Sequence, residues 1–173
     1  LIVFHVILGK TVPDISLNAV ANLGYADCRF LAPVYPGDTL TATSEILGLR
    51  ENSSGDSGIV YLRTNGVNQD DATVLTYVRW VMVRKLDKAA PAPTPSVPKL
   101  PEAVTADQLG AAVPPLHVAS WDKTLAGSAH LWDDYAVGER IDHVDGMTIE
   151  EAEHQVATRL YQNTARVHFN QHV

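Results

Sequence analysis

The sequence predicts an α+β protein in which an apolar helix packs on an antiparallel sheet. Leu1 to Lys10 is apolar enough for a buried helix, which Gly9 and Pro13 would end. Four segments rich in β-branched or alternating residues follow, and clusters of turn-forming residues separate them. One helix and at least four antiparallel strands form two layers, with the apolar face of the sheet against the helix.

The first two predicted strands flank a proline corner. The chain is expected to be extended from Gly24 to Leu31 and again from Thr39 to Leu49. Pro33 and Pro36 lie between them, and each removes a backbone donor, so the strand pairing must stop there. In the second of these strands, small or apolar residues alternate with threonines, which predicts one buried and one exposed face.

Two further strands are predicted, Gly58 to Val67 and Thr73 to Lys85, each after a polar turn cluster. Two residues of the expected core have side chains that could also act as a ligand or as a nucleophile. His5 lies in the apolar helix and Cys28 lies in a strand, and both are interpreted as buried core residues rather than as a ligand and a nucleophile.

Composition excludes several classes of function. The 173 residues are 46% hydrophobic with a net charge of −7 and no basic cluster, which argues against binding to nucleic acid or to an anionic membrane surface. No apolar run is long enough to cross a membrane. The single cysteine excludes an internal disulfide framework and favours a reducing, cytoplasmic location.

The middle of the chain differs in composition. Residues 87–130 are interpreted as a linker, and seven of the ten prolines lie between Asp87 and Leu116. Such a segment favours extended polyproline-like backbone and acts as a semi-rigid spacer.

A second unit is expected over 131–173. Residues 132–141 would form a loop and a short strand, and Thr148 to Glu151 would form a capping box for a helix that ends near Tyr161. The buried stripe of that helix would consist of Ile149, Ala152, Val156 and Leu160. Because the chain starts at Leu1 inside an apolar run, and stops at Val173 just after a motif, we expect it to be part of a longer protein.

Several stretches resemble a known family. The phrase from Arg29 to Leu40, RFLAPVYPGDTL, resembles the strand-corner-strand of the MaoC-like hot-dog dehydratases. The sequences of four further stretches are similar to those of the mesaconyl-CoA hydratases, or β-methylmalyl-CoA dehydratases, of that family. They are Gly9 to Ala19, Tyr77 to Lys85, Leu131 to Glu139 and Arg159 to Asn170.

The resemblance implies a double hot-dog fold. Residues 1–86 would be the C-terminal part of the first hot-dog unit and 131–173 the N-terminal part of the second. It also implies reversible hydration of an enoyl-CoA thioester, namely mesaconyl-CoA to β-methylmalyl-CoA, in a homo-oligomer. No cofactor is implied beyond the CoA of the substrate, and no metal site is expected. Such a reaction needs proton transfer to and from water and Cα, and donors for the enolate oxygen.

The resemblance places the catalytic histidine of the family at His168, which is expected to act as general acid/base. Where the wider family has an aspartate, this chain has Asn163. An amide cannot accept a proton, so Asn163 is expected to position water or to hold the enolate. Arg166 either pairs with a substrate carboxylate or forms a structural ion pair. Tyr161 and Asn170 are further candidates for substrate binding.

Two other functions are compatible with these observations. One is a hot-dog thioesterase, which also acts on CoA thioesters but needs a carboxylate base or nucleophile. The other is a non-catalytic hot-dog half that forms an interface, a description that fits Leu1 to Lys85.

Overall fold

The computed structural model describes residues 1–110, 115, 117–127 and 130–172. The chain divides into two compact units. The sheet-bearing unit is Leu1–Ala112 with Glu150–Val173, and the short unit is Val113–Ile149. Residues 111–114, 116, 128 and 129 of the expected linker, and Val173 at the end of the expected second unit, lie outside the described residues.

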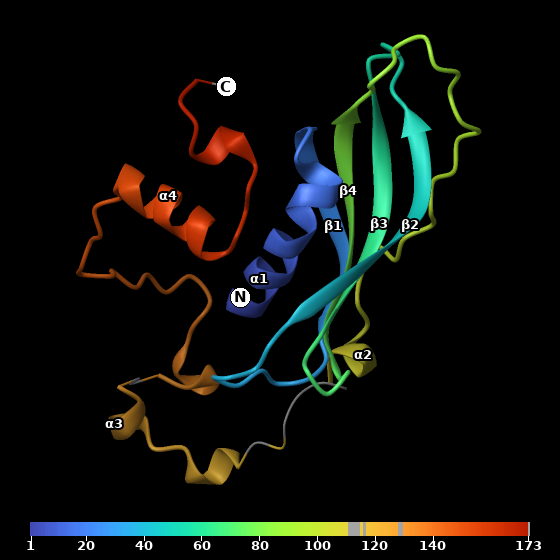
Figure 1. Ribbon diagram of the computed structural model, residues 1–173. Helices are drawn as coiled ribbons and strands as arrows, with labels where there is room; N and C mark the ends of the chain where they lie inside the picture. Colours follow the sequence, from blue (N-terminus) through green and yellow to red (C-terminus); the bar gives the residue numbers. More distant parts are fainter. Residues whose placement is uncertain (111–114, 116, 128–129, 173) are drawn as a thin grey trace. The chain divides into compact units, whose positions relative to one another are not determined.

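The sheet contains four antiparallel strands in the order β1-β4-β3-β2 (Figure 1). Their bounds are Ala19–Phe30 for β1, Thr41–Glu51 for β2, Ser57–Val67 for β3 and Thr73–Arg84 for β4. All four predicted strands are therefore confirmed. The pairing places Tyr25 of β1 and Leu62 of β3 on either side of Arg79 in β4, so these three side chains share one face of the sheet.

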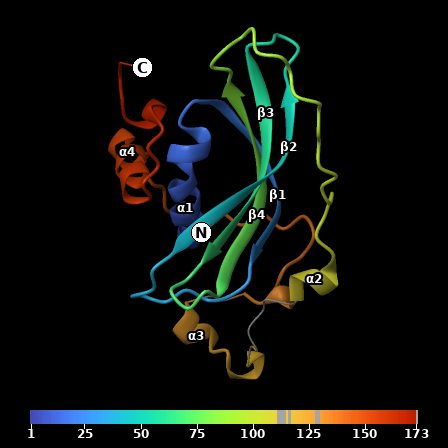
Figure 2. The same ribbon diagram turned by 45° about the vertical axis from the view of Figure 1, so that its right-hand side comes forward.

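Helix α1, Ile2–Thr11, lies along this face and continues into a π-helical turn, Val12–Ser16 (Figures 1 and 2). Its Ile7 is fully buried against Leu75 and Tyr77 of β4, and Val3, Phe4 and Leu8 pack around this cluster. The predicted helix-on-sheet layering is confirmed, and burial of apolar area between the two layers is what stabilises it.

The predictions for His5 and Cys28 are wrong. His5 is exposed on α1, and its ring stacks on Tyr161 with ring centroids 4.9 Å apart. Cys28 is exposed because a bulge between Ala26 and Arg29 breaks the alternation of β1, and Asp27 beside it adopts a φ of 49°. The partial burial of the thiol, followed by the charge of Asp27, raises the pKa of Cys28, which disfavours the thiolate of a nucleophile.

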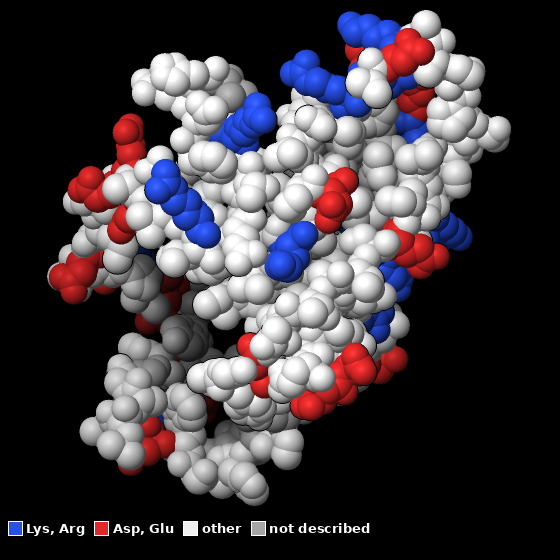
Figure 3. All heavy atoms as spheres, viewed as in Figure 1, with Lys and Arg blue, Asp and Glu red and all other residues white. Residues whose placement is uncertain are grey.

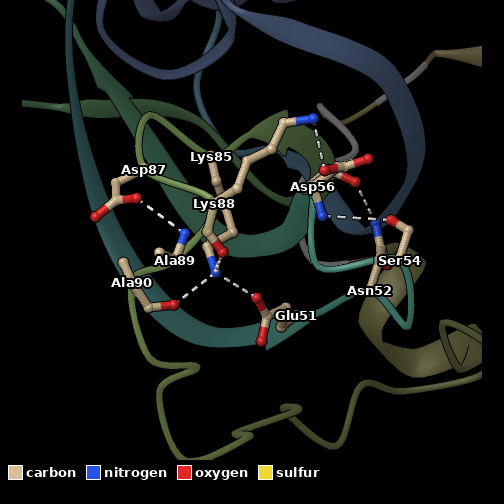
Figure 4. A network of polar contacts seen from close by, with 10 residues as sticks. Glu51, Asn52, Ser54, Asp56, Lys85, Asp87, Lys88, Ala89 and Ala90 are labelled. Carbon is tan, nitrogen blue, oxygen red and sulfur yellow. Dashed lines mark hydrogen bonds and ion pairs between the residues drawn. The ribbon is translucent and has the colours of Figure 1, made fainter.

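The proline-rich segment begins with a network of polar contacts at the end of β4 (Figure 4). Lys85 forms an ion pair with Glu51 and donates to the Ala90 carbonyl at 2.7 Å. Lys88 pairs with Asp56 at 2.7 Å. Further along, the Ser96 amide donates to the Leu49 carbonyl of β2 at 2.8 Å. The start of the segment is thus attached to the sheet, and a short helix, α2, Ala106–Gly110, follows it.

The described residues of the short unit form two 3₁₀ turns, Val118–Ser120 and Trp132–Asp134, and one helical turn, α3, Lys123–Ala126. Asp122 caps α3 by accepting from the amides of Thr124 and Leu125. The strand expected within 132–141 is wrong, since the described backbone there contains the second 3₁₀ turn and irregular structure.

Helix α4, Glu151–Leu160, returns to the sheet-bearing unit and lies beside α1 (Figures 1 and 2). Its predicted end at Tyr161 is confirmed. The capping box is wrong: Glu150 occupies the N-cap position, and no side chain caps the helix there. The predicted buried stripe is also wrong, because Val156 is 53% and Leu160 70% exposed and Thr158 is the buried side chain.

On the face shown in Figure 3, acidic and basic side chains are interspersed and most of the described surface carries no charge. Among the described residues, no helix is both long and apolar enough to span a bilayer.

Candidate active site

The segment after α4 turns back on itself and positions His168. The backbone amide of Asn163 donates to the Thr158 carbonyl at 3.0 Å. The preceding residue, Gln162, has a φ of 56°. The Asn163 side-chain oxygen then accepts from the Ala165 amide at 3.2 Å. A 3₁₀ turn, Arg166–His168, follows, in which the His168 amide donates to the Ala165 carbonyl. These backbone contacts fix the separation between Asn163 and His168.

This segment is held against α1 by a close backbone approach. Gly9 of α1 is buried, and a Cβ atom there would overlap the carbonyl oxygen of Tyr161. Only glycine allows the end of α4 to lie this close to α1. The stacking of Tyr161 on His5 adds a second contact between the same two helices.

Asn163 and His168 line one cavity of about 370 Å³, between the segment after α4 and the edge of the sheet. This volume is within the range of small-molecule sites. The rest of the wall comes from α1, the π-helical turn, β1, β4 and the segment after α4. It consists of Leu8, Val12, Ser16, Ala19, Val20, Ala21, Asn22, Tyr25, Arg79, Ala165 and Val167.

His168 has a second histidine beside it. His154 lies in the first turn of α4, and its Nε2 is 3.2 Å from Nδ1 of His168. Burial, followed by the charge of His154, holds the pKa of His168 below its ordinary value of 6.5. His168 is therefore neutral at neutral pH, as a general base must be before it accepts a proton.

Arg79 supplies a positive charge to the same cavity. It is 2% exposed and lies on the helix-facing side of β4. Its guanidinium donates to Thr11 Oγ1 at 2.8 Å and to Ser16 Oγ at 3.5 Å, and both hydroxyls come from the end of α1 and the turn after it. Burial lowers the pKa of Arg79, although arginine remains protonated in proteins.

The other predicted site residues lie around this cavity rather than in it. Arg166 is exposed and lines a neighbouring cavity of about 370 Å³ together with Arg84. Tyr161 lines a third cavity, of about 270 Å³, with His5, His154 and the other face of His168. The side chain of Asn170 accepts from the His172 amide at 3.0 Å, so it supports the turn after His168.

Within the described part of the chain, no three His, Cys, Asp or Glu side chains form a group that could hold a metal ion. The cavity is instead lined by an imidazole, two amides, two hydroxyls and a guanidinium. These groups can transfer a proton, orient water and bind an anion.

Neither His154 nor Arg79 was predicted from the sequence as a functional residue. A signal for Arg79 was present, since it alternates with Tyr77 and Val81 in a strand whose odd-numbered side chains face the helix. A charged residue on a buried face is unusual and points to a function. His154 gave no such signal, because its contact with His168 depends on how the chain turns after α4.

Known proteins are similar to this chain in sequence. A mesaconyl-CoA hydratase from Cereibacter sphaeroides is 63% identical over 98% of this chain, and a β-methylmalyl-CoA dehydratase from Chloroflexus aurantiacus is 63% identical over 100% of it. The chain spans 49% of the length of each of these curated relatives.

Solved structures agree on the fold. A crystal structure of a MaoC domain protein dehydratase from Chloroflexus aurantiacus superposes with a TM-score of 0.89 at 63% identity, over 99% of this chain and 48% of that one. A Mycobacterium tuberculosis protein with a double hot-dog fold matches at a TM-score of 0.55 and 23% identity, which shows the fold alone. The model of the Mesaconyl-CoA hydratase family matches residues 2–115. This chain, a hot-dog protein with the predicted α+β layering, therefore belongs to the mesaconyl-CoA hydratase family.

Proposed function

We propose that the whole protein catalyses the reversible hydration of an enoyl-CoA thioester, with mesaconyl-CoA and β-methylmalyl-CoA as the pair that it interconverts. The observation that carries this proposal is the cavity that His168 and Asn163 share. Membership of the family supports the choice of substrate, because the two relatives at 63% identity are named for these two thioesters.

His168 would act as the general acid/base. In the hydration direction its neutral imidazole takes a proton from water as the water oxygen bonds to Cβ of the enoyl group. The electron pair of the double bond moves toward the thioester carbonyl, and Cα then receives a proton. The net change is the addition of one water molecule across the double bond. The lowered pKa of His168 keeps the imidazole available as a base near neutral pH.

Asn163 would orient the attacking water. Its side-chain oxygen accepts a hydrogen bond from the backbone amide of Ala165. The NH₂ group of the same side chain therefore points away from Ala165. An amide NH₂ can donate to water or to an enolate oxygen and cannot take a proton. The proton transfer is therefore assigned to His168 alone.

Arg166, Tyr161 and Asn170 complete the proposed substrate-binding residues. Arg166 lies with Arg84 at a cavity next to the one with His168, where two guanidinium groups would favour an anionic part of the substrate. Tyr161 and Asn170 would act by holding the segment on either side of Asn163 and His168 in place.

A thioesterase is less well supported. Hydrolysis of a thioester by a hot-dog protein requires a carboxylate as base or nucleophile, and the described residues that line the cavity include no Asp or Glu. A purely interface-forming role leaves unexplained why an imidazole with a lowered pKa and a buried guanidinium share one cavity.

Assembly and location are part of the proposal. Exposed apolar side chains on α4, including Val156 and Leu160, favour packing against further protein in a homo-oligomer. The single cysteine and a CoA thioester as substrate favour the cytoplasm. The chemistry assigned to His168 and Asn163 calls for no cofactor.

The proposed function is tested by incubating the whole protein with mesaconyl-CoA. Loss of the enoyl-thioester absorbance without release of free CoA thiol is expected. Release of thiol at the rate of absorbance loss would identify a thioesterase, and an unchanged substrate would leave the interface-forming role as the better account.

A further inference from the structure

We infer that Arg79 binds the terminal carboxylate of the acyl group and so selects acyl-CoA substrates that carry one. This assignment rests on the proposed function and extends it to substrate specificity. The carrying observation is a buried cation, without a carboxylate partner among the described residues, that lines the same cavity as His168.

Arg79 differs from the arginines that make ion pairs in this chain. Arg29 and Arg63 both pair with Asp27, and Arg140 pairs with Asp142, and all three are more exposed than Arg79. A buried charge without a counterion is costly and is seldom retained for stability alone. Arg79, the most buried of these arginines, therefore has the greatest need for an anion. Among the described residues, its side-chain hydrogen bonds all go to hydroxyl groups.

The contacts of Arg79 leave one N–H of its guanidinium without a hydrogen-bond partner among the described residues. The hydroxyls of Thr11 and Ser16 take up N–H groups of the two terminal nitrogens. The Nε–H is buried and makes no hydrogen bond to any described residue. A carboxylate binds a guanidinium through two parallel N–H···O contacts. Nε–H would supply one of them, and a terminal N–H that now donates to a hydroxyl would supply the other.

The position of the cavity explains why this contact would matter for the reaction. In mesaconyl-CoA the carboxylate is attached to Cβ, the carbon that receives the water oxygen. A cation that holds the carboxylate in the cavity therefore fixes Cβ relative to His168 and Asn163, which line it too. Holding the reacting carbon in place raises the rate as well as the affinity.

Arg166, the earlier candidate for this role, is exposed and lines the neighbouring cavity with Arg84. An exposed guanidinium discriminates weakly between a carboxylate and a methyl group because water screens its charge. Arg79 is therefore the better candidate for specificity, and Arg166 is the competing assignment in the experiment below.

The test compares two unreactive thioesters that share CoA and differ at the far end of the acyl chain. Succinyl-CoA has a carboxylate there and butyryl-CoA has a methyl group. We expect the whole wild-type protein to bind succinyl-CoA at least about 30-fold more tightly by calorimetry, the size of the loss when a buried, hydrogen-bonded charge pair is broken. Arg79→Met should abolish this preference, and Arg79→Lys should retain part of it.

Arg63→Gln serves as the control for loss of a sheet arginine, and it should keep the full preference. Loss of the preference in Arg166→Gln with retention in Arg79→Met would overturn the inference and assign the role to Arg166. Equal binding of both thioesters by the wild-type protein would also overturn it.

The same variants distinguish a binding role from a structural one. Because Arg79→Met removes a buried charge and keeps most of the volume, its Tm should equal or exceed that of the wild type. A large fall in Tm would show that Arg79 is structural and would contradict the inference. Neither binding nor Tm depends on turnover. Absence of hydratase activity would therefore overturn the proposed function alone, and the preference for succinyl-CoA would still decide the role of Arg79.

Discussion

Nε2 of His154 lies 3.2 Å from Nδ1 of His168. This contact holds one nitrogen of the proposed catalytic imidazole and leaves its other nitrogen for the proton that is transferred. The charge of His154 also disfavours the charged form of His168, and it is the second cause, after burial, of the lowered pKa of His168. The pair therefore positions His168 and sets its protonation.

Replacing His154 should shift the pH dependence of the reaction. In the wild type the acid limb of kcat/KM should lie below pH 6.5, because a lowered pKa keeps the base neutral down to a lower pH. In His154→Ala the limb should move upward, toward the ordinary value, since one of the two causes has been removed. His143→Ala, which changes an exposed histidine of the short unit, is the control. An unchanged limb in His154→Ala would contradict the coupling.

Gly9→Ala should separate α1 from the end of α4. The added methyl group overlaps the Tyr161 carbonyl oxygen, which is backbone and cannot move without displacing the segment that carries Asn163 and His168. We expect a loss of about 1–3 kcal/mol in unfolding free energy, as is typical of overpacking, together with a lower kcat. Gly55→Ala, at a turn with open space around it but a φ of 73°, is the control that costs stability without altering the cavity. Unchanged turnover in Gly9→Ala would show that this contact does not support the site.

Asn163→Asp tests the role of the amide. A carboxylate there adds a negative charge close to a substrate that is already anionic, so KM for mesaconyl-CoA should rise. The change should be larger at low ionic strength, because salt screens the repulsion. Initial rates at two salt concentrations measure this. A faster enzyme with an unchanged KM would indicate instead that the site accepts a second proton-transfer group.

Limited trypsin digestion should cut at Lys99 before Lys85 or Lys88. The backbone around the two earlier lysines is attached to the sheet by the contacts of Lys85 and Lys88, whereas Lys99 lies beyond the Ser96–Leu49 hydrogen bond and is exposed. Mass spectrometry of the first fragments identifies the site. Initial cleavage at Lys85 would mean that this network does not hold the segment against the sheet.

The sheet and α1 were predictable because their signals are local. Alternation and turn clusters located β3 to within one residue at its start, and the apolar run located α1. β1 was harder, since it begins at Ala19 rather than at Gly24 and its bulges break the alternation. The same irregularity exposes Cys28, whose burial no local pattern could exclude.

The functional cavity was only partly predictable. The resemblance identified His168 and Asn163, and the structure brings them together. The roles of His154 and Arg79 depend on which surfaces meet in three dimensions: α4 contacts α1 through its C-terminal end, and α1 covers the charged position of β4. For the same reason the apolar stripe of α4 was predicted correctly as a pattern and wrongly as a buried face, because periodicity does not identify the surface that covers it.

In the proposed mechanism, His168 transfers the proton in the hydration of an enoyl-CoA. The most direct measurement is the steady-state turnover of mesaconyl-CoA by the whole protein carrying His168→Ala, with His172→Ala as the matched control. Loss of the general acid/base should lower kcat by about 10²- to 10⁴-fold while KM changes little, and His172→Ala should retain most of the activity. Turnover close to that of the wild type in His168→Ala would contradict the mechanism.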